Sequence, residues 1–154
     1  MRNVLTIVPG LAGVLAVSAC GSGQHAVFTA VSKVGPLSVP TPSGFHARTW
    51  PGGVVISDRA GKIPIPLENQ AGLAGYPRQD ELAVYTTLFH ERPPTLSLPL
   101  TLNSLEQASD GLTEWRGGGS IGGGQYVVDV WLGKNASAAH RAALLSALRT
   151  IKSR

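Results

Sequence analysis

The stretch of residues 81–91 reads ELAVYTTLFHE and is rich in β-branched and aromatic side chains. Alternate residues of an extended chain point to opposite faces. One face would carry Val84, Thr86 and Leu88, and the other Tyr85, Thr87 and Phe89. Pro93-Pro94 follow, and proline cannot donate to a strand ladder. The stretch therefore predicts a central strand of a β-sheet that ends before these prolines.

Further strands are predicted on both sides of this segment. Residues 45–50 and 53–57 flank the turn dipeptide Pro51-Gly52, and residues 112–116 and 125–132 flank a glycine-rich segment. Residues 62–66 alternate apolar residues with prolines and predict an edge or free extended segment. Residues 97–102 are also expected to be extended, with Asn103 or Ser104 capping a short helix through Ala108.

The C-terminal segment predicts a helix. Ser137 is a good N-cap for a helix that runs from Ala138 to about Lys152. Its apolar stripe would consist of Leu144, Leu145, Leu148 and Ile151. Such a stripe needs a sheet face to cover. We therefore expect an α+β fold: a mostly antiparallel sheet of four to six strands with the C-terminal helix packed on one face.

Composition narrows the class of protein. The chain has 154 residues, of which 14% are charged and 43% hydrophobic, and this balance argues against intrinsic disorder. The 19 Gly and 11 Pro residues indicate many turns. A single Cys excludes an internal disulfide framework and any multi-cysteine metal site.

The N-terminus has the pattern of an export signal. Arg2 precedes the apolar run of residues 4–17, and the small residues Ser18 and Ala19 stand before Cys20. The segment Val17-Ser18-Ala19-Cys20 resembles the lipobox of bacterial lipoproteins, which implies lipidation of Cys20 and cleavage before it. An ordinary secretory peptide cut after Ala19 is the alternative. Lipidation is favoured because the only cysteine of the chain stands at this position.

The resulting division is a lipoprotein signal peptide over residues 1–19, a flexible tether over 20–42, and a single globular α+β domain over 43–154. Gly21 to Gly23 and the prolines at 36, 40 and 42 suggest the tether. The strings SGFHARTWP at 43–51 and VWLGK at 130–134 resemble segments of exported proteins of high-GC Gram-positive bacteria. That resemblance implies no activity and no catalytic residues.

The glycine-rich segment 117–124 matches two motifs. Gly118, Ser120 and Gly122 satisfy the pattern of a serine-hydrolase elbow, but that elbow must open a helix, and a strand is predicted next. Gly117, Gly119 and Gly122 also match the glycine pattern of dinucleotide-binding sites, but that pattern too must open a helix. We expect a long, mobile hairpin loop, too long for a two-residue turn. Its candidate binding residues are Gly117, Gly118, Gly119, Ser120, Gly122, Gly123 and Gly124.

No metal or cofactor site is predicted. The histidines His25, His46, His90 and His140 are scattered, with no pair spaced to bind a metal from one helix. A triad of His46, Asp129 and Ser120 has no support from the pattern.

Two further features are open to more than one interpretation. Asp129 is expected to face solvent; if it is buried, Arg116 or Arg48 on a neighbouring strand is the expected partner. Trp50, Trp115 and Trp131 would form either an aromatic shelf or, as we favour, ordinary core and rim packing.

Charge is uneven along the chain. From Lys134 onward all charged side chains are basic, which suits a helix C-terminus and a weak attraction to anionic lipid or wall polymer. Nucleic acid is not an expected partner for an exported chain. We therefore predict a lipid-anchored, non-enzymatic binding or accessory module on the extracytoplasmic face of the cell membrane, with an envelope protein or wall polymer as its possible partner. The alternative is a small secreted hydrolase that uses Ser120 or a histidine.

Overall fold

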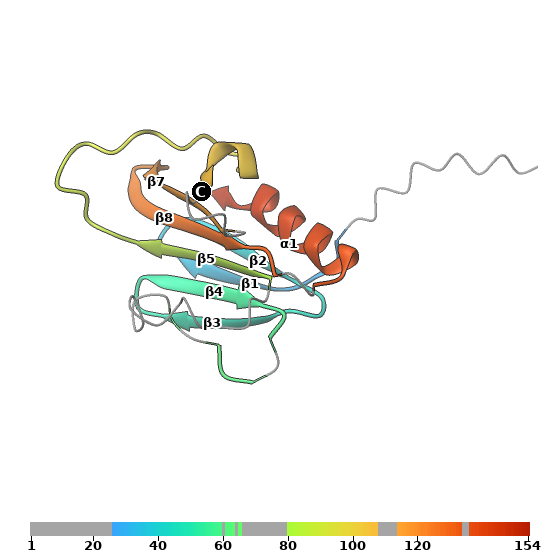
Figure 1. Cartoon of the computed structure of the whole chain (residues 1–154). Coiled ribbons are helices and arrows are strands. Elements are labelled where there is room, and N and C mark those ends of the chain that lie inside the picture. The colour runs from blue at the N-terminus through green and yellow to red at the C-terminus, as the bar shows by residue number, and fades with distance from the viewer. Residues whose placement is uncertain (1–25, 60, 64, 66–79, 108–113, 134–135) are drawn as a thin grey trace, which may run out of the picture.

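The computed structural model describes residues 26–59, 61–63, 65, 80–107, 114–133 and 136–154. The predicted signal peptide, Cys20 and the first part of the predicted tether lie outside these residues. A six-stranded antiparallel sheet has the order β3-β4-β5-β8-β7-β6 (Figure 1). Its strands are β3 (His46–Trp50), β4 (Gly53–Ser57), β5 (Glu81–Thr86), β6 (Glu106–Gln107), β7 (Glu114–Ile121) and β8 (Gly124–Trp131).

A second sheet contains β1 (Phe28–Val34), β2 (Leu37–Pro42) and the short C-terminal β9 (Lys152–Ser153). The prediction of a tether through residue 42 is therefore wrong from Phe28 onward. Val34, Leu37 and Val39 are buried in the main core, and this burial outweighs the preference of the prolines for free chain. Pro40 and Pro42 are tolerated because β9 pairs only with Leu37 and Ser38, so β2 has a single ladder partner at the prolines.

The helix α1 (Ala138–Thr150) begins where the sequence predicts. The Ser137 hydroxyl accepts a hydrogen bond from the N–H of His140 at 3.1 Å. Leu144, Ala147 and Leu148 are its buried residues, whereas the predicted Leu145 is only half-buried. The helix ends two residues before the predicted limit because Lys152 and Ser153 pair with β2 instead.

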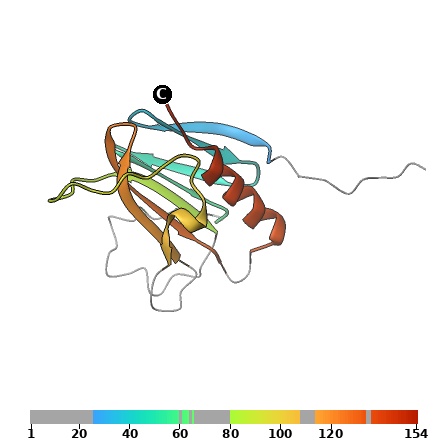
Figure 2. The ribbon, with the colours of Figure 1, turned by 90° about the horizontal axis from the view of Figure 1, so that it is seen from above.

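The helix and the second sheet cover one face of the six-stranded sheet, as seen from above in Figure 2. The main core lies between these layers and includes Val54 and Ile56 of β4, Leu82 of β5, and Val128 of β8. The opposite face of the large sheet carries a smaller apolar cluster of Val55, Ile63, Ala83 and Tyr85. We call this second side the outer face.

The α+β class and the C-terminal helix are confirmed, with two sheets in place of the expected one. β5 is a central strand, but it ends at Thr86, well before Glu91. The short helix is a 3-10 turn, η3 (Leu102–Ser104), which follows Thr101 rather than Asn103 or Ser104. Within the described ranges, no helix is long and apolar enough to cross a membrane.

Candidate functional site

The glycine-rich segment is part of the sheet. β7 runs through Gly117, Gly118, Gly119 and Ser120 to Ile121, and β8 starts at Gly124. Only Gly122 and Gly123 form the turn, with φ values of 56° and 85°. Positive φ at both central residues is the requirement of the tight hairpin turn that matches strand twist. The prediction of a long, mobile loop is therefore wrong.

Neighbouring groups explain why three successive residues of β7 are glycine. A Cβ on Gly117 would lie 2.5 Å from Cδ2 of Leu105, and one on Gly118 would lie 2.8 Å from Cζ of Phe89. A Cβ on Gly119 would lie 2.7 Å from the main-chain oxygen of Pro94. Side chains on both faces, and a segment beside the strand, thus occupy the space that larger residues would need.

The free edge of β7 is only partly covered. At one end Arg116 pairs with Glu106 of β6, and at the other the Ser120 N–H donates to Pro94 O at 2.8 Å. Both main-chain groups of every second residue of an antiparallel strand face the same edge. Gly118, midway between Arg116 and Ser120, therefore presents its N–H and C=O to this edge. Neither the β6 ladder nor the bridge between Thr95 and Ser120 extends to it.

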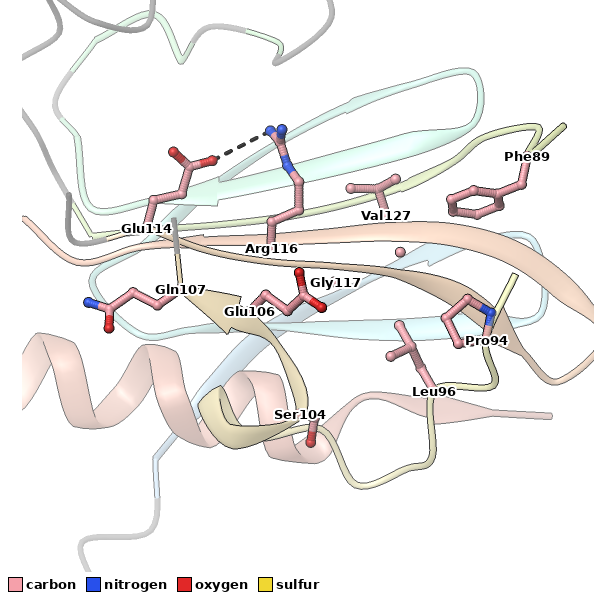
Figure 3. Close-up of a pocket in the computed structure, with 11 residues that line it drawn as sticks. Phe89, Pro94, Leu96, Ser104, Glu106, Gln107, Glu114, Arg116, Gly117 and Val127 are labelled. Carbon is pink, nitrogen blue, oxygen red and sulfur yellow. Dashed lines mark ion pairs between the residues drawn. The ribbon is translucent and has the colours of Figure 1, made fainter. Parts of the chain in front are cut away.

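A groove of about 880 Å³ surrounds this edge (Figure 3). In Figure 3, Phe89, Arg116 and Val127 lie on one side of the strand, and Leu96 and Ser104 on the other. The lining combines apolar side chains, three charged side chains and strand backbone. Its residues are Phe89, Pro94, Leu96, Ser104, Glu106, Gln107, Glu114, Arg116, Gly117, Gly118 and Val127. The volume falls within the range of ligand sites, roughly 300–1,000 Å³.

A buried ion pair fixes the charged wall of the groove. Asp129 is fully buried, so the expectation that it faces solvent is wrong. Its partner is Arg116, one of the two arginines expected for the buried case. Arg116 Nε lies 2.6 Å from Asp129 Oδ1, and the guanidinium is about half exposed. The Tyr85 hydroxyl donates to Asp129 Oδ2 at 3.0 Å. Two donors thus satisfy the carboxylate, as a charge inside a protein requires.

The pKa values of Arg116 and Tyr85 are both raised at this site. The hydrogen bond to Asp129 raises the pKa of the Arg116 guanidinium above its ordinary value. Burial, followed by the negative charge of Asp129, raises the pKa of the Tyr85 hydroxyl. Arg116 therefore stays charged and Tyr85 stays protonated at every physiological pH.

Carboxylates outnumber cations at the groove. Glu114 Oε1 lies 3.5 Å from Arg116 NH2, so Arg116 faces both Glu114 and Asp129. Glu106 is directly opposite Arg116 in the ladder, is exposed, and forms no ion pair with any side chain that the structure describes. Among the described residues, the carboxylates of Glu106, Glu114 and Asp129 and the guanidinium of Arg116 together carry a formal charge of −2.

The predicted glycine site residues divide into three groups. Gly117 and Gly118 line the groove, and Gly119 and Ser120 carry the contact with the segment at Pro94. Gly122 and Gly123 lie in the turn, and Gly124 begins β8, all outside the groove lining. Three residues of the groove lining, Phe89, Leu96 and Glu106, were not predicted from the sequence. They reach the groove because the chain passes β7 again in three dimensions, and no local sequence pattern indicates this.

The geometry contradicts the hydrolase motifs. Ser120 lies within a strand that turns into another strand, so no helix N-terminus stands beneath it. β3, which carries His46, is four strand spacings from β7, roughly 19 Å at about 4.8 Å per spacing. Asp129 is engaged by Arg116 and Tyr85. His46, Asp129 and Ser120 therefore do not form a catalytic triad.

Among the described residues, no cluster of three or more His, Cys, Asp or Glu side chains is arranged to hold a metal ion. His140 Nδ1 lies 3.2 Å from Asp58 Oδ2, and His25 is outside the described residues. Trp50 and Trp131 pack on the outer face, whereas Trp115 packs against the main core. The three tryptophans thus form no common shelf.

A buried carboxylate joins the start of β5 to the end of β8. Asp80 is fully buried, and its Oδ1 accepts the N–H of Gly133 at 2.7 Å. Burial raises the pKa of the Asp80 carboxyl above its ordinary value of 3.8, and the Gly133 hydrogen bond opposes this shift. Asp80 lies outside the groove lining and belongs to the framework.

The chain matches no family model and no curated protein sequence.

Proposed function

We propose that this chain is a lipid-anchored, non-enzymatic binding or accessory module of the bacterial cell envelope, and that the groove along β7 is its binding surface. The groove carries this proposal. It combines an apolar wall, a fixed ion pair and open strand backbone, which is the mixture typical of ligand sites. Residues of the chain itself hold Arg116 and Asp129 together, so binding would not have to order this ion pair.

The lipobox pattern at Cys20 supports the anchor and the extracytoplasmic location. Only residues 21–27 separate Cys20 from the start of β1 at Phe28. Seven residues reach at most about 25 Å when fully extended. The folded part would therefore lie next to the membrane, closer than the predicted 23-residue tether would place it, and a ligand would be met near the lipid surface.

The anchor is tested by Cys20→Ser in cells fed an alkyne-tagged fatty acid. We expect the wild-type chain to carry the label and to sediment with membranes, and the variant to lose both properties. An unprocessed chain that keeps its signal peptide would also sediment, so the size of the product is measured in parallel. Labelling of the Cys20→Ser chain would refute the lipoprotein assignment.

The binding surface is tested by replacing Gln107, which lines the groove and is exposed, with a photo-crosslinking derivative of phenylalanine. The matched control places it at exposed Thr49 of β3, at the opposite edge of the sheet. We expect a defined adduct in intact cells from Gln107 and none from Thr49. Equal adducts from the two positions, or none from either, would refute a binding role for the groove.

A further inference from the structure

The charge of the groove selects its ligand. Among the described residues that line the groove, Arg116 is the one cation, and Asp129 and Glu114 both lie within ion-pair distance of it. An anionic ligand would meet the Arg116 guanidinium, which two carboxylates already neutralise, next to the negative charge of Glu106. A cationic ligand would instead find Glu106 free of any ion pair with the described side chains. Charge complementarity therefore favours a cation.

The remaining lining favours a peptide over a simple cation. Phe89, Pro94, Leu96 and Val127 give the groove apolar walls on both sides of the strand edge. A small polyamine would leave these walls in water. The N–H and C=O of Gly118, which pair on this edge with no strand that the structure describes, can pair with one residue of an extended segment. The alternate side chains of such a segment then reach neighbouring pockets.

We propose that the groove receives an extended peptide segment with a Lys or Arg side chain, whose positive charge is neutralised by Glu106 and whose apolar neighbours pack on Phe89 and Leu96. This inference rests on the proposed binding function and adds the class of its ligand. Two structural details agree with it. Glycine at 118 leaves room for the Phe89 ring over the strand, and Glu106 is held on the rim by its pairing with Arg116 across β6 and β7.

The test measures fluorescence anisotropy of a short, labelled peptide of alternating Lys and Leu, with the full chain in neutral detergent at low ionic strength. A peptide of alternating Glu and Leu is the probe of opposite charge. We expect the basic peptide to bind at least tenfold more tightly than the acidic one. Added salt is expected to weaken binding because exposed charges are screened over about 10 Å at 0.1 M. N-methylation of the peptide backbone is expected to weaken it because Gly118 loses its partner.

The key variant is Glu106→Lys, which should weaken binding of the basic peptide about tenfold, because it removes one exposed attraction and adds one exposed repulsion of similar size. Glu91→Lys is the matched control: Glu91 is exposed, lies outside the groove, and gives the same change in net charge. It should change affinity less than about twofold. Glu106→Gln, with an expected loss of about threefold, replaces Glu106→Lys if the latter unfolds.

Equal affinity for the two peptides, absence of binding, or an equal effect of Glu91→Lys and Glu106→Lys would overturn the inference. The crosslink at Gln107 separates this failure from failure of the proposed function. If the adduct persists in cells while the basic peptide does not bind, the ligand class is wrong and the binding function stands. If both are absent, the binding function itself is wrong.

Discussion

Replacement of Arg116 by Leu is expected to destabilise the chain through the charge that it leaves behind. Asp129 is fully buried and would keep only the hydroxyl of Tyr85 as a donor. Removal of one partner of a buried pair costs about 3–5 kcal/mol. Because the Arg116 side chain is 54% exposed, water reaches the site and we expect a cost below this range, about 2–3 kcal/mol.

The assay is urea unfolding at neutral pH, with the double variant Arg116→Leu/Asp129→Leu as the control. The double variant has no buried charge to leave unpaired, so it should recover more than half of the loss. A loss below about 1 kcal/mol for Arg116→Leu, or a double variant less stable than the single one, would refute the assignment of Asp129 as a buried charge held by Arg116.

Three further predictions concern the framework of the site. Gly118→Ala should cost about 1–3 kcal/mol in urea unfolding because its Cβ meets Phe89, and a second change, Phe89→Ala, should reduce that cost; an unchanged cost would exclude the contact as its cause. Ser137→Ala should lower the unfolding free energy by about 1 kcal/mol through loss of the cap, whereas a neutral result would show that the cap contributes nothing. Asp80→Asn tests the raised pKa of the buried Asp80 carboxyl. Because the native state holds the Asp80 proton more tightly than the unfolded state, the wild type should lose stability relative to the variant as pH rises above 3.8. A stability difference that does not depend on pH would contradict this.

The strands of the large sheet with alternating side chains were predictable from sequence. β3 and β4 occur where the Pro51-Gly52 turn places them. The alternation in residues 81–86 indicates a strand with one face in the main core and the other in the apolar cluster of the outer face. Ser137 and the apolar stripe also predict α1 within two residues. In these segments, local pattern and tertiary packing favour the same conformation.

The groove was not predictable because local and tertiary requirements differ there. Glycine and proline indicate loops when only their own backbone is considered. In β7, glycine is needed because Leu105, Phe89 and Pro94 approach the strand, and in β2 the prolines are accommodated on a partly unpaired strand. Both requirements come from residues distant in sequence, and neither follows from the composition of the segment itself.

Asp129 illustrates the same limit for charge. A single acidic residue in an apolar strand is compatible with either face, and the sequence gives Arg116 and Arg48 as equal candidates for its partner. The β7–β8 register decides between them, because it places Arg116 directly opposite Asp129. Arg48 instead donates to the main-chain oxygen of Ile63 at 2.7 Å.

The most direct test of the central claim is the yield of the Gln107 photo-crosslink in cells, measured in chains that also carry Glu106→Lys or Glu91→Lys. If the groove binds a basic segment through Glu106, Glu106→Lys should lower the yield of the adduct about tenfold while Glu91→Lys leaves it unchanged, at equal levels of folded protein. An adduct that forms equally well in both variants would contradict recognition of a basic segment through Glu106.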